Sequence, residues 1–230
     1  MAYKHLIQKD VPIVTYPLDQ KSSSGAFDAY SLYVSDKAYV VDSSGATNVS
    51  YSIPAYDVPL VNGNNISSYL GDSASTKLIR TPAFSFFTEK TKNTSYCLEF
   101  WTRLSPSDIS GTEKWLMRTG FSFANSALPI GIVIKDQHIN FRYGNAKTGT
   151  GKYQNISIPI DKFNQPLHIV VGVSKTSIFI SCNGIKVAKN FVTIPTLNTF
   201  DSTKDYLYFG DSYASMEISC ISLYDYILED

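Results

Sequence analysis

Charged residues are scarce in this chain. Of its 230 residues only 17% are charged, and 20 Lys and Arg residues balance 20 Asp and Glu residues, so the formal net charge is zero. A neutral chain has no general electrostatic attraction to phosphate groups. The densest basic stretch is "KTK" at 90–92, which fits a solvated turn. We therefore expect neither nucleic acid nor a membrane as a partner.

Cysteine is also rare, and its pattern excludes two kinds of site. The three residues Cys97, Cys182 and Cys220 lie inside apolar, strand-like runs. An odd number of Cys without a secretory leader argues against a disulfide framework. The absence of a CxxC motif or a His–Cys cluster argues against zinc. We expect these thiols to act as small apolar side chains.

Long apolar runs are missing as well. No stretch approaches 18 apolar residues, and the opening "MAYKHLIQKDVPIV" lacks the apolar segment of a secretory leader. The sequence therefore predicts a chain that is made in the cytoplasm. Hydrophobic residues make up 43% of the total, which is enough for a proper core, and 230 residues suit one large all-β domain.

Short strand signals at intervals of about ten residues fill most of the chain, and no segment has the pattern of an amphipathic helix. In "TSIFISCNGIKVAKN" (176–190), alternating apolar residues stop at Asn183-Gly184 and then resume. Asn-Gly tolerates the positive φ angles of a two-residue hairpin loop, so we predict a β-hairpin. In "SYCLEFWTRL" (95–104), alternation places Tyr96, Leu98, Phe100 and Thr102 on one face. We also predict a tight turn at Asp136-Gln137, within the two strands of 128–144.

The usual catalytic patterns are absent. There is no GxSxG motif, and Glu99 is the only acid in its strand, whereas a glycoside hydrolase needs a pair of carboxylates across the scissile bond. We expect Glu99 to be structural or salt-bridged, and His168 to be structural rather than functional. The sequence therefore predicts a protein that is not an enzyme.

Four motifs in this order resemble the concanavalin A-like jelly roll in its laminin-G-like form: "YPLD", "SYCLEFWTRL", "PLHIVVGVSKTSIFISCNGIKV" and "LYFGDSYASMEISCISLYDYIL". The resemblance covers residues 13–228. It implies an all-β sandwich of two antiparallel sheets over residues 13–230, preceded by an N-terminal arm at 1–12. It does not imply one function, because proteins of this fold bind sugars or proteins, hydrolyse glycans, or form parts of assemblies. Similar stand-alone chains look like structural proteins of tailed bacteriophages.

Two loops are candidates for sugar binding, namely "NGNN" at 62–65 and "YGNAKTGTGKY" at 143–153. The segment "YGNAKTGTGKY" (143–153) combines two Tyr residues with an amide, and it fits either a mobile hairpin tip or a glycan site built from Tyr143, Asn145 and Tyr153. Some relatives of this fold hold one calcium ion, for which Asp19, Asp205 and Asp211 at loop edges are candidate ligands, although no EF-hand spacing is present. We expect no other cofactor.

The 16 Tyr residues suit half-buried strands, and they also suit an interface. The best candidate for an assembly surface is the N-terminal third, together with the arm, since its strands are short and broken by Pro. The candidate contact residues are Tyr3, Leu6, Ile7, Tyr30, Tyr33 and Tyr39. We therefore expect a non-enzymatic virion protein of a tailed phage, which acts in head, tail or baseplate within a homo- or hetero-oligomeric assembly. The alternative is a lectin-like carbohydrate-binding module that recognises a surface glycan.

Overall fold

The regular elements of the described part of the protein are all β-strands. The computed structural model describes residues 12–18, 26–27, 38–41, 53–54, 66–70, 78–83, 95–105, 113–119, 130–144, 154–191, 206–210 and 216–228. All regular elements in these segments are strands, which confirms the all-β class. None of these segments contains a helix that is long and apolar enough to cross a membrane. Residues 1–11 of the predicted arm lie outside the described part.

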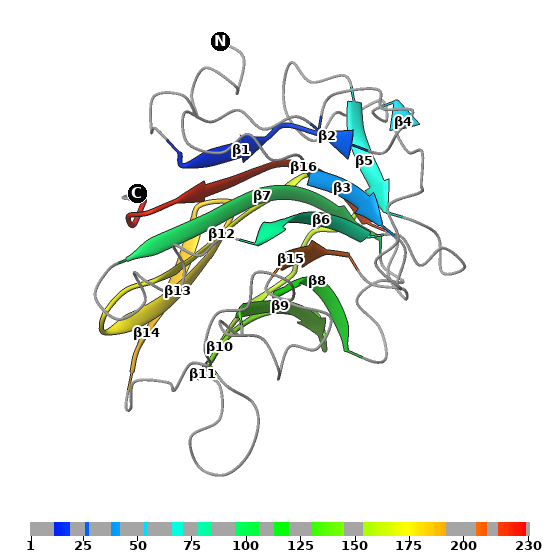
Figure 1. Ribbon diagram of the computed structural model, residues 1–230. Coiled ribbons are helices and arrows are strands. Elements are labelled where there is room, and N and C mark those ends of the chain that lie inside the picture. Colours follow the sequence, from blue (N-terminus) through cyan, green and yellow to red (C-terminus); the bar gives the residue numbers. More distant parts are fainter. Residues whose placement is uncertain are drawn as a thin grey trace.

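The strands form two antiparallel sheets that pack face to face, and β7, β12 and β16 arch over β8, β9 and β15 (Figure 1). Sheet A has the order β14 (Ile185–Asn190), β13 (Ser177–Cys182), β12 (Leu167–Val173), β7 (Tyr96–Leu104), β16 (Met216–Tyr224), β5 (Ile66–Leu70) and β4 (Ile53–Pro54), and β1 (Val14–Tyr16) also pairs with β16. Sheet B has the order β11 (Gln154–Pro159), β10 (His138–Tyr143), β9 (Ile130–Lys135), β8 (Lys114–Thr119), β15 (Tyr206–Phe209), β6 (Leu78–Ala83), β3 (Ala38–Val41) and β2 (Ala26–Phe27). The predicted two-sheet sandwich is thereby confirmed.

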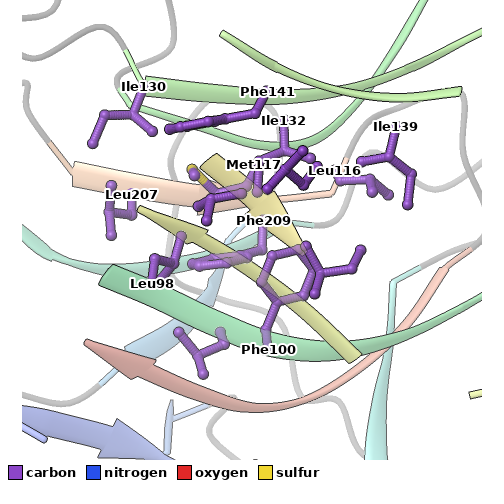
Figure 2. Close-up of a cluster of buried hydrophobic side chains, with 14 of the residues drawn as sticks. Leu98, Phe100, Leu116, Met117, Ile130, Ile132, Ile139, Phe141, Leu207 and Phe209 are labelled. Carbon is purple, nitrogen blue, oxygen red and sulfur yellow. The ribbon is translucent and has the colours of Figure 1, made fainter. Parts of the chain in front are cut away.

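The core lies between the sheets and follows the period-2 alternation of each strand. On β7, the side chains of Tyr96, Leu98 and Phe100 are buried in it, as the sequence predicts. From sheet B come apolar side chains of β8, β9, β10 and β15, several of which Figure 2 shows facing Leu98 and Phe100. The rings of Phe100 and Phe209 meet edge to face across the sandwich, with centroids 5.5 Å apart and planes at 76°.

Two tight hairpins form where the sequence predicts them. Asn183 and Gly184 have φ angles of 49° and 82° between β13 and β14, and Asp136 and Gln137 have φ angles of 50° and 61° between β9 and β10. Positive φ at both central residues gives the turn a twist that matches the flanking strands. Asn183 also ties its turn to the neighbouring strand, because its Oδ1 accepts a hydrogen bond of 2.8 Å from the backbone N–H of His168.

A β-bulge in β8 determines which of its side chains lie on the outer face of sheet B. The pairing of β8 with β9 shifts between Trp115 and Met117, so that Leu116 is the extra residue. Leu116 and Met117 are consecutive, yet both are completely buried in the core. Trp115 and Arg118, three residues apart, consequently both belong to the opposite face of the sheet.

Candidate binding face on sheet B

Side chains from four neighbouring strands of sheet B form a grid on its outer face. They alternate along β9, β10 and β11 with core residues such as Ile132, Phe141 and Ile156. Register places the outward residues in three rows across the strands: Arg118–Gly131–Arg142–Asn155, Trp115–Val133–Asn140–Ser157 and Lys135–His138–Pro159. We call these three rows the outer grid. It combines an aromatic ring, two amides and two guanidinium groups on one surface.

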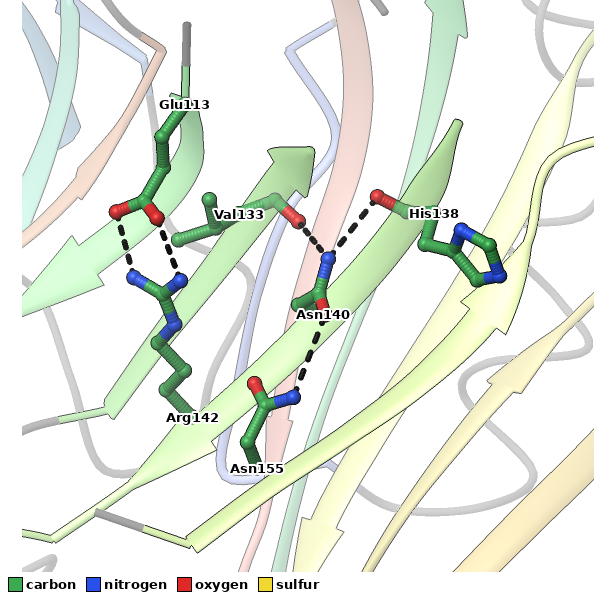
Figure 3. A network of polar contacts seen from close by, with 6 residues as sticks. All are labelled: Glu113, Val133, His138, Asn140, Arg142 and Asn155. Atoms are coloured by element: carbon green, nitrogen blue, oxygen red, sulfur yellow. Dashed lines mark hydrogen bonds and ion pairs between the residues drawn. The ribbon is translucent and has the colours of Figure 1, made fainter. Parts of the chain in front are cut away.

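An ion pair fixes one guanidinium group of the grid. Arg142 Nη1 and Nη2 donate to Glu113 Oε1 and Oε2, each at 2.5 Å (Figure 3). This two-point contact is the largest cause that holds the pKa of Glu113 below its ordinary value. The guanidinium carbon also lies 5.8 Å from the ring centroid of Trp115. Arg142 is therefore held in one orientation by two neighbours.

The two amides of the grid are linked to each other and to the backbone. Asn140 Nδ2 donates to the carbonyl of His138 at 3.2 Å and is 3.5 Å from that of Val133. Asn155 Nδ2 donates to Asn140 Oδ1 at 3.3 Å, so one chain of hydrogen bonds runs from β9 to β11 (Figure 3). These bonds orient both side chains before any ligand arrives.

This arrangement suits a ligand that carries many hydroxyl groups. Trp115 and Asn140 are half-buried and Ser157 is exposed, whereas the Arg142 side chain is 11% exposed and the central residues Gly131 and Val133 are buried. A ring face packs against the apolar face of a sugar, while amide and guanidinium groups exchange hydrogen bonds with its hydroxyls. The described residues hold no cluster of three or more His, Cys, Asp or Glu side chains that is placed to bind a metal ion.

The structure corrects one of the predicted glycan residues. Tyr143 is a core residue with 3% exposure, and its ring stacks on that of Phe191 with centroids 5.7 Å apart. Burial raises the pKa of Tyr143 to about 12. The prediction that Tyr143 offers its ring to a sugar is therefore wrong, because the alternation of β10 turns it inward.

The other predicted site residues are placed only in part. Tyr39 lies in β3, where its backbone pairs with that of Ala26 and Arg80, and its side chain is outside the described part. The remaining residues all lie outside the described segments: the glycan candidates Asn145, Tyr153 and the loop at 62–65, the assembly candidates Tyr3, Leu6, Ile7, Tyr30 and Tyr33, and the calcium candidates Asp19, Asp205 and Asp211. Their roles stay predictions.

The outer face of sheet A carries a closed polar cluster around Glu99. This carboxylate is 5% exposed, and it accepts a hydrogen bond from the Tyr224 hydroxyl at 2.6 Å. Its second oxygen lies 3.0 Å from His168 Nε2, and the His168 ring stacks on Trp101 with centroids 4.7 Å apart. Both carboxylate oxygens thus have partners, which agrees with the structural roles predicted for Glu99 and His168.

None of the residues of the outer grid was among the predicted site residues, although the sequence contains a pattern that indicates some of them. In "HINFRY" (138–143), alternation alone places His138, Asn140 and Arg142 on one face. The outward-facing residues of β8 are harder to predict, because the bulge at Leu116 breaks the alternation of the strand. The predicted turn at Asp136-Gln137 places β10 next to β9, but nothing local indicates that β8 pairs with the other side of β9.

Comparisons with known proteins identify the fold. No protein-family model matches the sequence, and no curated protein matches it either. Solved structures similar to the chain include the receptor-binding domain of botulinum neurotoxin C/D mosaic serotype, with 13% identity and a TM-score of 0.65. The binding domain of botulinum neurotoxin DC is also similar, with 12% identity, in its complexes with SialylT (TM-score 0.66) and with rat synaptotagmin II (TM-score 0.69).

These likenesses extend over 96% of this chain but only 49% of each neurotoxin domain. The chain therefore spans about half the length of the structures that it matches. At this level of identity the shared property is the sandwich fold. The neurotoxin domains are described as binding receptors.

Proposed function

We propose that this protein is a carbohydrate-binding module and that the outer grid of sheet B is its ligand face. The observation that carries the proposal is the grid itself: a Trp ring, two oriented amides and a fixed guanidinium group lie together on one half-buried face. Such a mixture of an apolar platform and convergent polar groups suits sugar hydroxyls. The similar structures are binding domains, and one of them was solved in complex with SialylT. This supports a role in ligand binding rather than in catalysis.

The two Trp residues of the chain provide a matched test. Trp115 lies in the grid on sheet B, whereas Trp101 lies on the outer face of sheet A, and both are half-buried. We expect Trp115→Ala to weaken retention on a glycan array by about tenfold, which corresponds to the loss of about 1.4 kcal/mol of ring contact. Trp101→Ala should leave retention unchanged. Melting temperatures of both variants separate lost binding from lost folding.

Two results would contradict this function. If the intact protein retains no glycan, the module is not carbohydrate-binding. If the two Trp variants lose retention equally, the grid is not the ligand face.

We propose as a second candidate that the module serves in an assembly, in its finer form the virion of a tailed phage. The observation that favours it is the edge strand β14, whose residues are exposed or half-exposed and whose Ile185 is 67% exposed. An exposed edge strand can pair with an extended segment of a neighbour. In this proposal the arm at residues 1–12, with Tyr3, Leu6 and Ile7, anchors the domain.

Sedimentation separates the two candidates. An assembly subunit should travel with a large particle at fixed stoichiometry, and deletion of residues 1–12 should abolish incorporation while the domain stays folded. A chain that sediments at about its own mass of 25.5 kDa would exclude the subunit role. Full incorporation of the truncated chain would exclude the arm as the anchor.

A further inference from the structure

Arginine is distributed very unevenly in this molecule. Only four of the 20 basic residues are Arg, namely Arg80, Arg103, Arg118 and Arg142. Arg103 lies on sheet A and pairs with Glu217 at 3.0 Å. The other three belong to the outer face of sheet B. Since Lys serves at most basic positions of the chain, this concentration of Arg calls for a physical explanation.

The three arginines lie in one straight row across the strands. Tyr208 of β15 is opposite Arg80 of β6 on one side and opposite Arg118 of β8 on the other. Gly131 of β9 is likewise opposite both Arg118 and Arg142 of β10. We call Arg80–Tyr208–Arg118–Gly131–Arg142 the arginine row. Each Arg is two strands from the next, so their Cα positions recur at about 10 Å, twice the strand spacing.

Neighbouring side chains hold the guanidinium groups of Arg80 and Arg142 in place. The guanidinium carbon of Arg80 lies 4.8 Å from the ring centroid of Tyr206, and its side chain also bonds to that of Tyr208. Arg142 is held by Glu113 and Trp115. Gly131 adds no side chain between Arg118 and Arg142. Arg80 and Arg118 are half-buried and the Arg142 side chain is 11% exposed, and partial burial strengthens the interaction of a guanidinium group with an anion relative to a fully exposed cation.

The chemistry of Arg points to an anion with several oxygens. A guanidinium group offers a rigid fork of N–H donors that matches carboxylate, sulfate or phosphate at two points, whereas the ammonium group of Lys does not. The half-buried ring of Trp115 lies beside Arg142, and Asn155 continues the row on β11, whereas Tyr208 is buried between Arg80 and Arg118 with 3% exposure. A ligand that crosses the strands would meet an Arg side chain at every second strand, and at Arg142 it would meet a guanidinium group that is already paired with the Glu113 carboxylate.

We infer that the arginine row binds an extended acidic polysaccharide whose carboxylate or sulfate groups recur along the chain. This inference rests on the proposed carbohydrate-binding function and specifies the class of ligand. The amide of Asn155 beside the row suits the hydroxyl groups of a sugar chain, and the zero net charge of the protein supplies no general attraction to the phosphate backbone of a nucleic acid.

The test measures binding of the full chain to four polymers by affinity electrophoresis at low and moderate salt. The probes are heparin, which carries sulfate and carboxylate, polygalacturonate, which carries carboxylate alone, neutral dextran, and poly-dT. We expect both acidic polysaccharides to bind and dextran to bind at least tenfold more weakly. Arg118→Gln should lower the affinity for the acidic probes by tenfold or more, the usual effect of losing one charge-assisted contact. Arg118→Lys keeps the charge but loses the fork, so several-fold weakening is expected.

The matched control is Lys186→Gln, which removes the same charge from the exposed strand β14 of sheet A and should leave binding unchanged. If Arg118→Gln and Arg118→Lys, both shown by melting curves to be folded, bind like this control, the arginine row is not the site. If dextran binds as well as polygalacturonate, glycan binding stands and the acidic ligand is refuted. If poly-dT binds while no polysaccharide does, both the inference and the proposed function fall. Binding of heparin without polygalacturonate would support the row and assign it to sulfate.

Discussion

A glycine on the outer face of sheet A makes a strong prediction about packing. Gly172 of β12 lies opposite Cys97 of β7 and Phe179 of β13. A Cβ atom added at Gly172 would be 2.1 Å from Phe179 Cε1, 2.6 Å from its Cζ and 3.0 Å from Cys97 Sγ. The Phe179 ring therefore covers the backbone of Gly172 and occupies the space of its missing side chain. Gly172→Ala must displace this ring.

The ring has little room to move. Phe179 is 6% exposed and packs in a cluster with Cys97, Val170 and Tyr224. Overpacking of this kind costs about 1–3 kcal/mol. Replacing Gly by Ala inside a strand otherwise gains about 0.5–1 kcal/mol of unfolding free energy. We therefore expect a net loss of about 1–2 kcal/mol, which for a domain of this size lowers the melting temperature by about 2–8 °C.

Urea denaturation followed by circular dichroism measures this loss, and a second substitution identifies its cause. In a Phe179→Leu background the ring is gone, so adding Gly172→Ala should then be neutral or stabilising. Gly184→Ala is the control: φ is +82° there and no atom lies within 4 Å of the added Cβ, so its cost comes from the backbone. Phe179→Leu should not relieve that cost. The reasoning is refuted if Gly172→Ala is as stable as the wild type, or if it costs as much with Leu at position 179.

Two further predictions concern titratable groups. Because Arg142 lowers the pKa of Glu113 in the folded state, the pair stabilises the protein above the ordinary Glu value of 4.5 and loses this effect as the pH falls through the lowered pKa. Glu113→Gln should remove this part of the pH dependence of the unfolding free energy, which is at most about 1 kcal/mol for a partly exposed pair. Urea titrations at pH 3 and pH 7 measure the change. If the pH dependence of the variant equals that of the wild type, the pair does not have this effect. Burial raises the pKa of Cys97 to about 12 and that of Cys182 to about 11, so both thiols should react very slowly with a disulfide reagent at pH 8 until urea unfolds the chain. Fast reaction of the native protein would show that these thiols are not shielded.

The fold was readable from local patterns because its strands alternate and its tightest turns have distinct residues. Asn183-Gly184 adopts the positive φ angles predicted for it, and Asp136-Gln137 forms the predicted tight turn. The inward face of β7 follows its alternation as well. These features depend on neighbours in sequence, which a single chain reveals.

The candidate face was not readable in the same way, since it depends on register between distant segments. The alternation of "HINFRY" is enough to place Arg142 on the same face as Asn140, but its partner Glu113 comes from a segment 29 residues away. The loop beside β10 attracted attention through its Tyr residues, and Tyr143 proved to belong to the core. The arginine row needs the order of β6, β15, β8, β9 and β10 in sheet B, and residues 78–143 give no local hint that β15 lies between β6 and β8.

The position of β16 affects how this sandwich is completed during synthesis. β16 follows every other strand in the sequence, yet β7 pairs with it on one side, and β5 and β1 pair with it on the other. Sheet A therefore cannot be completed until residues 216–224 have been synthesised, and until then one edge of β7 is unpaired. Partners so distant in sequence give a high contact order, which slows folding. A nascent chain stalled before residue 216 should therefore be a target for chaperones, because it exposes the unpaired edge that β16 later covers.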